Sequence, residues 1–395
     1  MRESLLFYCQ HSLGIGHLTR SFALAAALRA HFRVVFLNGG RLPPGVPVPQ
    51  GIELVDLPPL GMDDGHTVVS RGEQTDVGPM MAQRRRLIEA TAARVQPALL
   101  LVELFPFGRK KFAGEILPMI RAARQQGARV ACSLRDILVA ARPDQQHHDD
   151  RAAWICRRWF DAVLVHADPH MARLEDSFRP RRPLAVPVHY TGYVVPGRNR
   201  GGRAHRAGAG APILVSAGGG LVGFPLLRAA LEAHALLDPA TRPRLELVAG
   251  PFLPEPEWRQ MGAAAAARAD VTLLRSVPDL AARMRGAALS LSQCGYNTAM
   301  DIVAAGVPAL VVPYAQGRED EQTNRARRMA GLGLLRMLEP GRLEPAVLAE
   351  EMLRTLSFRP RANALDLDGA ERTGELLRSL QPRGRAAPNT MQRIA

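Results

Sequence analysis

The sequence predicts an α/β protein built from two doubly wound parallel-sheet domains of the Rossmann type in tandem. Its 395 residues exceed the length at which a single hydrophobic core usually stops growing. Short apolar runs alternate with helix-length segments from one end of the chain to the other. This pattern stops once, in a Gly-, Pro- and Arg-rich stretch at 196–212, and then restarts. Two α/β domains joined by a linker account for these observations.

The apolar runs are the predicted strands. Their Val, Leu and Ile residues follow one another without alternation, which suits parallel strands covered by crossover helices on both faces. The runs lie at 4–9, 33–37, 51–55, 98–104, 128–134, 161–166, 184–190, 212–217, 244–250, 270–274, 287–292 and 309–313. We therefore place the two domains at 1–196 and 212–360, with a linker at 197–211. A helix is expected at 361–381, where it could pack back on the first domain, and a disordered tail at 382–395.

The composition is that of a cytoplasmic protein with a strongly positive field. No apolar run approaches the length of a membrane span, and "MRESLLFYCQ" is too short for a secretory signal. The four cysteines lie far apart, so we expect reduced, buried thiols. A net charge of +14 would attract phosphates, anionic lipids or nucleic acid. The sequence has no nucleic-acid-binding pattern. Between nucleic acid and an anionic membrane surface, we therefore prefer peripheral contact with the membrane.

A first glycine turn, "HSLGIGHLTRS" at 11–21, follows the first predicted strand and leads into a predicted helix. Gly14 and Gly16 permit a tight turn and leave backbone amides uncovered, which suits an anion at the helix N-terminus. A dinucleotide fingerprint would need a third glycine where Thr19 stands, and no acid ends the next strand, so NAD is not expected.

His17 distinguishes this turn as a candidate for chemistry. At a helix N-terminus the dipole disfavours the imidazolium, so the neutral imidazole is able to take a proton near pH 7. The alternative is a loop histidine that only bonds the backbone. Glu103 and Asp136, at the ends of other strands of the first domain, are weaker candidates to orient His17.

A second glycine turn, "VSAGGGLVGF", fits G-x-G-x-x-G through Gly218, Gly220 and Gly223. The next strand ends in Ala249 and Gly250 rather than in an acid that would hold a ribose. We therefore interpret this turn as a diphosphate cradle outside a dinucleotide site.

The segment "QCGYNTAMDIVAAGVPALVVP" at 293–313, with "EDEQ" at 319–322, resembles the donor-binding signature of nucleotide-sugar glycosyltransferases of the GT-B fold. It is similar to the plant box H-C-G-W-N-S and to the family 28 enzymes that make lipid II. "GIGHLTR" resembles the glycine turn of that family and of nucleotide-sugar hydrolases from pseudaminic acid synthesis. "ELFPFGRKKF" and "SLRDIL" are similar to an uncharacterised group of predicted glycosyltransferases.

The resemblance implies a GT-B architecture with the two domains facing across a cleft, and it assigns roles to residues. Asp301 would bind the ribose, Glu321 and Gln322 the sugar, and the base would lie against Ser276 and Val277. The diphosphate would lie against the segment from Ser292 to Asn297 and the amides of the second turn. The residues implied there are Gly218, Gly219, Gly220, Ser292, Gln293, Cys294, Gly295 and Asn297, and Thr298 belongs to the same signature. Gly14, Gly16 and Arg20 are predicted to form a loop that binds the acceptor or a phosphate.

Single features of the signature have other interpretations. Thr298 and Asp301 could form a capping box, and acids such as Glu321 suit any first helical turn. Gln293 replaces the histidine of the plant box, which removes one charge-assisted phosphate contact. Glu321 replaces the aspartate of the plant D-Q pair, so the identity of the donor sugar is left open.

The expected function is an inverting, metal-independent transfer of a hexose or N-acetylhexosamine from a UDP-sugar to an acceptor hydroxyl, with His17 as base and no cofactor. The acceptor could be a glycan, a lipid-linked molecule or a small molecule. "HHDD" at 147–150 and "DLD" at 366–368 are interpreted as solvated helix faces rather than metal sites. Two alternatives remain: a nucleotide-sugar hydrolase of the same fold, and a non-enzymatic protein that binds nucleotides or nucleic acid.

Overall fold

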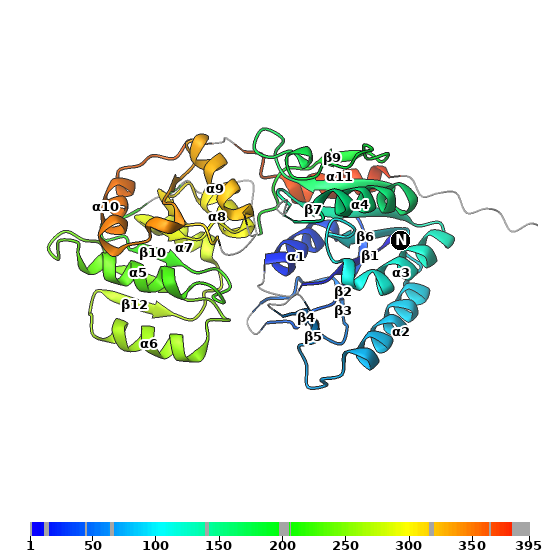
Figure 1. Ribbon diagram of the computed structural model, residues 1–395, viewed down its shortest axis with the longest axis horizontal. Coiled ribbons are helices and arrows are strands. Elements are labelled where there is room, and N and C mark those ends of the chain that lie inside the picture. The colour runs from blue at the N-terminus through cyan, green and yellow to red at the C-terminus, as the bar shows by residue number, and fades with distance from the viewer. Residues whose placement is uncertain are drawn as a thin grey trace, which may run out of the picture.

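The computed structural model forms two lobes that lie side by side (Figure 1). It describes residues 2–11, 16–43, 46–63, 67–138, 142–196, 205, 207–315, 320–362 and 365–380. Gly14, most of the predicted linker and the predicted tail at 382–395 lie outside the described residues.

The first lobe is a seven-stranded parallel sheet in the order β3-β2-β1-β6-β7-β8-β9. Its strands are β1 (Ser4–Cys9), β2 (Arg33–Asn38), β3 (Glu53–Asp56), β6 (Leu99–Glu103), β7 (Arg129–Arg135), β8 (Ala162–His166) and β9 (Val188–Tyr190). Its helices are α1 (Gly16–Leu28), α2 (Val77–Val95), α3 (Ala113–Gln125) and α4 (Gln145–Trp159), with short 3₁₀ turns η1 (Lys110–Phe112) and η2 (Leu174–Asp176). The strand order reverses between β1 and β6, where loops bind ligands in such sheets.

The second lobe repeats this topology with six parallel strands in the order β12-β11-β10-β13-β14-β15. The strands are β10 (Ile213–Ser216), β11 (Leu245–Val248), β12 (Val271–Leu274), β13 (Leu289–Ser292), β14 (Ala309–Val311) and β15 (Arg336–Met337). The helices are α5 (Phe224–Ala235), α6 (Glu255–Ala266), α7 (Leu280–Gly286), α8 (Tyr296–Ala305), α9 (Glu321–Gly331) and α10 (Pro345–Leu356), with the 3₁₀ turn η3 (Pro340–Arg342). The order reverses between β10 and β13.

The predicted α/β fold with two doubly wound sheets is confirmed, and every predicted apolar run contains a strand. Two elements were not predicted. The antiparallel hairpin of β4 (Leu60–Met62) and β5 (Val68–Ser70) and the two-residue strand β15 are too short to give an apolar run.

Both faces of the first sheet are covered, as continuous apolar strands require. Along β1, Leu5 and Phe7 belong to one apolar core together with residues of α1, whereas Leu6 and Tyr8 belong to a second core with residues of α2 and α3. All four cysteines are free and buried, as predicted.

The last helix, α11 (Gly369–Ser379), packs against α1 and therefore lies in the first lobe (Figure 1). A β-bridge joins Val194 to Asp368 at the point where the chain returns. The "DLD" segment precedes this helix and is partly buried, so the prediction of a solvated helix face is wrong there. The carboxylate of Asp366 forms an ion pair with Arg372, and the backbone N–H of Asp366 donates to the carboxylate of Asp168.

A buried ion pair joins the two lobes. Arg325 of α9 donates two hydrogen bonds, of 2.8 and 2.7 Å, to the carboxylate of Asp136, which follows β7, and both side chains are completely buried. The sequence suggests Asp136 as a residue that orients His17. The structure corrects this, because both oxygens of the carboxylate accept hydrogen bonds from Arg325.

We expect Asp136→Ala to lower the free energy of unfolding by about 3–5 kcal/mol, because it removes the hydrogen-bonded counterion of the buried Arg325 guanidinium and leaves only the longer ion pair with Glu321, at 3.7 Å. Denaturant unfolding of the purified chain measures this. The control is Glu339→Ala, which breaks an exposed pair with Arg327 and is expected to cost less than about 1 kcal/mol. Similar losses in the two variants would contradict a structural role for the buried pair.

Candidate active site at the junction of the two lobes

His17 and Glu103 form a hydrogen-bonded dyad at the carboxyl edge of the first sheet. Glu103 is the last residue of β6, and His17 is the second residue of α1, which follows the neighbouring strand β1. The distance from His17 Nδ1 to Glu103 Oε1 is 2.7 Å. Because a carboxylate only accepts, Nδ1 carries the proton and Nε2 is left as the acceptor. The structure thus brings His17 together with one of its two suggested partners.

The dyad lies in a largely dry environment. Glu103 is completely buried, and the His17 side chain is 18% exposed. Burial is the largest influence on His17 and lowers its pKa to about 3, although the Glu103 carboxylate opposes this shift. Burial acts to raise the pKa of Glu103, but the hydrogen bond from His17 and the charges of Arg109 and Arg20 lower it to about 2. At neutral pH, His17 is therefore neutral and Glu103 ionised, which is the state a general base requires.

Arg20 connects this dyad to the second lobe. Its Nη2 donates to Glu103 Oε1 at 2.7 Å, and its guanidinium lies over the ring of Tyr296, 5.1 Å from the centroid. The ring of Tyr296 also has the guanidinium of Arg325 over it, at 5.9 Å. Tyr296 is the first residue of α8, so the acceptor loop and the predicted donor loop are in direct contact.

The N-termini of α1 and α8 come together at this junction. The Asn297 side-chain amide donates to the Gly16 carbonyl at 3.1 Å, across the two lobes. Both residues lie in the first turn of their helices, where the helix dipole is positive. The predicted phosphate residue Asn297 therefore holds the two loops together, while its Oδ1 has no hydrogen-bond partner within the described part of the chain.

The segment before α8 is fixed by side chains of α9. The Gln322 side-chain oxygen accepts the N–H of Cys294 at 3.0 Å and that of Tyr314 at 3.2 Å. The Cys294 carbonyl accepts from Arg325 at 2.9 Å. Gln322 is thus placed at the predicted donor loop, where it positions backbone through its oxygen.

Asp301, on the second turn of α8, has a carboxylate with no hydrogen-bond or ion-pair partner among the described residues. Burial, followed by repulsion from Asp279, raises its pKa to about 7, and Arg285 opposes the shift. An unpaired acid in this position suits a ligand that donates hydroxyl hydrogens, as the prediction of a ribose contact requires. The capping-box interpretation of Thr298 is wrong, because the N-cap of α8 is Gly295.

Glu321, predicted to bind sugar hydroxyls, forms an ion pair with Arg135 of the first lobe. The hydrogen bond from Arg135 Nη1 to Glu321 Oε1 is 2.9 Å. The sugar contact stays a prediction, and a donor sugar at this point would meet a residue from each lobe.

The second glycine turn lies between β10 and α5, as predicted. Gly220 has φ +93°, and a Cβ there would come within 2.6 Å of the Ala249 carbonyl. Its N–H donates to the Ala217 carbonyl at 3.0 Å, so this amide of the predicted diphosphate cradle is already occupied. Gly218 is exposed and Gly219 partly exposed.

The remaining predicted donor residues lie on the loops after β12 and β13. Ser276 is exposed and Val277 partly buried, beyond the carboxyl end of β12. Ser292 ends β13, and its buried hydroxyl has no partner among the described residues. Gln293 donates to the Val222 carbonyl at 3.1 Å.

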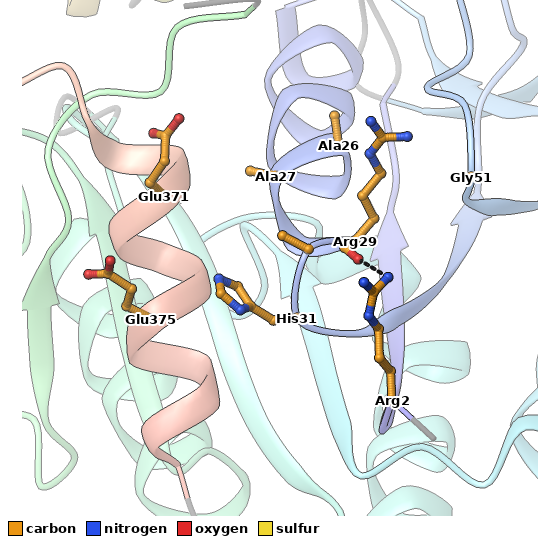
Figure 2. A pocket seen from close by; sticks show the side chains of 9 residues that line it. Arg2, Ala26, Ala27, Arg29, His31, Gly51, Glu371 and Glu375 are labelled. Carbon is orange, nitrogen blue, oxygen red and sulfur yellow. Dashed lines mark hydrogen bonds between the residues drawn. The ribbon is translucent and has the colours of Figure 1, made fainter. Parts of the chain in front are cut away.

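A pocket of about 640 Å³ lies between the carboxyl end of α1 and α11. Residues such as His31, Glu371 and Glu375 line it (Figure 2). None of the predicted site residues lines it, and it lies at the opposite end of α1 from His17. We therefore do not assign the candidate site to this cavity.

The "HHDD" stretch lies near the start of α4, as predicted. The prediction that it is solvated is wrong for His148 and Asp149, which are buried. The Asp149 carboxylate accepts the backbone N–H of Arg179 at 2.8 Å. Across the described ranges, no group of three or more His, Cys, Asp or Glu residues is arranged to hold a metal.

Four residues at this junction are not among those predicted from the sequence: Tyr296, Arg325, Arg135 and Arg109. The aromatic residue within the glycine turn was the available signal for Tyr296, since the plant box has tryptophan there. Arg135 and Arg325 form ion pairs with acidic residues of the other lobe, and Arg109 forms one with the acidic residue that ends β6. A single sequence carries no signal for such ion pairs.

Residues 219–371 match the model of the Glycosyltransferase family 28 C-terminal domain. A relative in Burkholderia cenocepacia is the UDP-N-acetylglucosamine–N-acetylmuramyl-(pentapeptide) pyrophosphoryl-undecaprenol N-acetylglucosamine transferase, which is 32% identical over 176 residues. The match covers 44% of this chain and 46% of the relative, so the chain spans about half the length of the curated relatives it matches.

Two solved structures resemble the whole chain. Acinetobacter baumannii MurG has a TM-score of 0.57 at 16% identity, over 95% of this chain and 99% of that one. Phytolacca americana UGT2, complexed with UDP-2fluoro-glucose and pterostilbene, has a TM-score of 0.56 at 16% identity, over 96% and 94%.

The fold is that of the GT-B glycosyltransferases, as the sequence resemblance implied. The second lobe matches the C-terminal domain of glycosyltransferase family 28, as the sequence resemblance implied. The comparisons do not support the hydrolase and nucleic-acid alternatives. No helix in the described ranges is both long and apolar enough to cross a membrane.

We expect the His17 imidazole to remain the neutral Nδ1–H tautomer from pH 8 down to at least pH 5, because its pKa is lowered to about 3. Below pH 6.5 the unfolded chain binds a proton at this residue that the folded chain does not, so the contribution of His17 to stability falls as the pH drops toward 3. Imidazole ¹⁵N chemical shifts measure the tautomer, with His17→Gln to assign the signal. A titration midpoint between pH 6 and 7 would contradict the dry dyad.

Proposed function

We propose that this protein transfers an N-acetylhexosamine or hexose from a UDP-sugar to an acceptor hydroxyl. The observation that carries the proposal is the neutral His17–Glu103 dyad, joined through the contact between Gly16 and Asn297 to the N-terminus of α8 in a family 28 domain. A UDP-linked donor is supported by the Burkholderia relative, which is named as a transferase that uses UDP-N-acetylglucosamine, and by the Phytolacca enzyme, which was solved with UDP-2fluoro-glucose.

In the proposed reaction, His17 Nε2 removes the proton of the acceptor hydroxyl as its oxygen attacks C1 of the donor sugar. Attack opposite the departing diphosphate inverts the configuration at C1. Glu103 holds the imidazole tautomer and stabilises the imidazolium that forms. The N-termini of α1 and α8 place positive potential where the leaving diphosphate gains charge, so we propose that the step needs no metal ion.

Donor recognition is proposed for the second lobe. The unpaired Asp301 would accept the ribose hydroxyl hydrogens, and the ion-paired Glu321 together with Gln322 would contact the sugar. The base would lie against the loop at Ser276 and Val277. The acceptor would lie against the first lobe, and the positive net charge supports a peripheral position on an anionic membrane surface if that acceptor is lipid-linked.

We expect Asp301→Ala to weaken UDP binding at least tenfold, because a hydrogen bond to an ionised group contributes about 1.5–3 kcal/mol. Calorimetric titration with UDP measures this, and Glu350→Ala, a surface change on α10, serves as control. Because the pKa of Asp301 is raised to about 7, affinity should increase between pH 6 and 8 in the native protein but not in Asp301→Asn. Unchanged UDP affinity in Asp301→Ala would contradict the donor-site assignment.

We expect His17→Ala to lower the rate of sugar transfer by about 10²–10⁴-fold, the usual contribution of a general base. The assay measures UDP release from UDP-N-acetylglucosamine with and without a lipid extract as acceptor, in EDTA. His31→Ala, beyond the other end of α1, should keep the native rate. Free sugar released equally fast without acceptor would contradict transfer, and a residual rate near the native value in His17→Ala would contradict the mechanism.

A further inference from the structure

Arg109 lies beside the dyad in a loop with unusual backbone geometry. The loop follows β6, and both Leu104 and Arg109 have left-handed backbone conformations, with φ of +63° and +57°. The Gly108 N–H donates to the Leu104 carbonyl at 2.8 Å, which closes the loop. Non-glycine residues rarely adopt such φ values, and their occurrence points to a constraint that the surrounding structure maintains.

The guanidinium of Arg109 is nearly buried and poorly satisfied. The side chain is 13% exposed, and its Nε is 3.8 Å from Glu103 Oε2, beyond hydrogen-bond distance. Within the described part of the chain, Nε and Nη2 of Arg109 are buried without a hydrogen-bond partner. The same holds for Nε of Arg20, whose side chain is 2% exposed. Buried guanidinium N–H groups without partners are costly in the absence of a ligand.

The charges of this cluster do not balance. Glu103 is the carboxylate that contacts both Arg20 and Arg109, so one negative charge faces two positive charges. The neighbouring His11 and His17 have lowered pKa values and are neutral at pH 7. Burial raises the pKa of the nearby Cys9 thiol to about 12, so it supplies no negative charge. One positive charge therefore remains without a counterion beside the N-terminus of α1.

We propose that Arg109, together with Arg20, binds an oxyanion of the acceptor, a phosphate or carboxylate close to the hydroxyl that reacts. A guanidinium presents a planar fork that suits such a group, and the first turn of α1 adds positive potential. The site would select anionic acceptors over neutral ones. The inference rests on the proposed function, because it assigns the acceptor to this edge of the first sheet.

The test is a titration of the whole chain, saturated with UDP to occupy the donor site, with inorganic phosphate, pyrophosphate and acetate in turn. We expect at least one of these anions to bind, and Arg109→Gln to weaken that binding at least tenfold. Lys110→Gln, which changes the exposed cation next along the chain, should leave it unchanged. Tighter binding of phosphate or pyrophosphate would identify a phosphorylated acceptor, and tighter binding of acetate a carboxylated one.

Arg109→Lys keeps the charge but removes the fork, so an intermediate affinity is expected. This variant decides the question if Arg109→Gln does not fold. Equal anion affinity in native protein and in a folded Arg109 variant, or no anion binding to the UDP-saturated native protein, would overturn the inference. UDP affinity should be the same in all variants. A native protein that does not bind UDP would overturn the proposed function instead, and titration without UDP would still measure the role of Arg109.

Discussion

The candidate site depends on one buried interaction, the ion pair between Arg325 and Asp136. A charge pair removed from water is stable only where the geometry is good and the other donors are satisfied. Arg325 meets this condition because it also donates to the Cys294 carbonyl, at the start of the predicted donor loop. The pair therefore fixes α9 and the segment before α8 to the end of β7. It thereby supports the contact between Asn297 and Gly16, together with the bonds of the Tyr296 hydroxyl.

Tyr296 connects the ion pair to the dyad. The guanidinium groups of Arg325 and Arg20 both lie over its ring, and Arg20 donates a hydrogen bond to Glu103. The hydroxyl of Tyr296 donates to the His166 carbonyl and accepts the N–H of Val194, both at 3.0 Å. A single aromatic side chain of the second lobe thus contacts the backbone of the first lobe and Arg20, which is bonded to Glu103. The predicted donor and acceptor loops are therefore organised as one unit rather than as two independent sites.

The fold could be predicted from the sequence because apolar strands between helix-length segments have few other arrangements. The dyad was accessible for a related reason: β1 and β6 are neighbours in a doubly wound sheet, so His17 and Glu103 had to meet at the same edge. Asp136 lies at that edge too, but its partner Arg325 comes from another lobe, 189 residues later. The partners of Glu321 and of "HHDD" were hidden for the same reason, because tertiary neighbours leave no periodic signal. Arg109 required knowledge of a loop with two left-handed residues, which its composition does not show.

The return of the chain at α11 brings together the two places where the polypeptide passes between the lobes. The polypeptide leaves the first lobe after Val194 and re-enters it at Asp368, and these residues are bridged. The Tyr193 N–H donates to the Asp366 carbonyl at 2.8 Å, next to the bridge. The two passages of the chain between the lobes are therefore tied to each other on the first lobe. Because Tyr296 is hydrogen-bonded to Val194 beside this bridge, the first residue of α8 is anchored at the same place where the chain leaves and re-enters the first lobe.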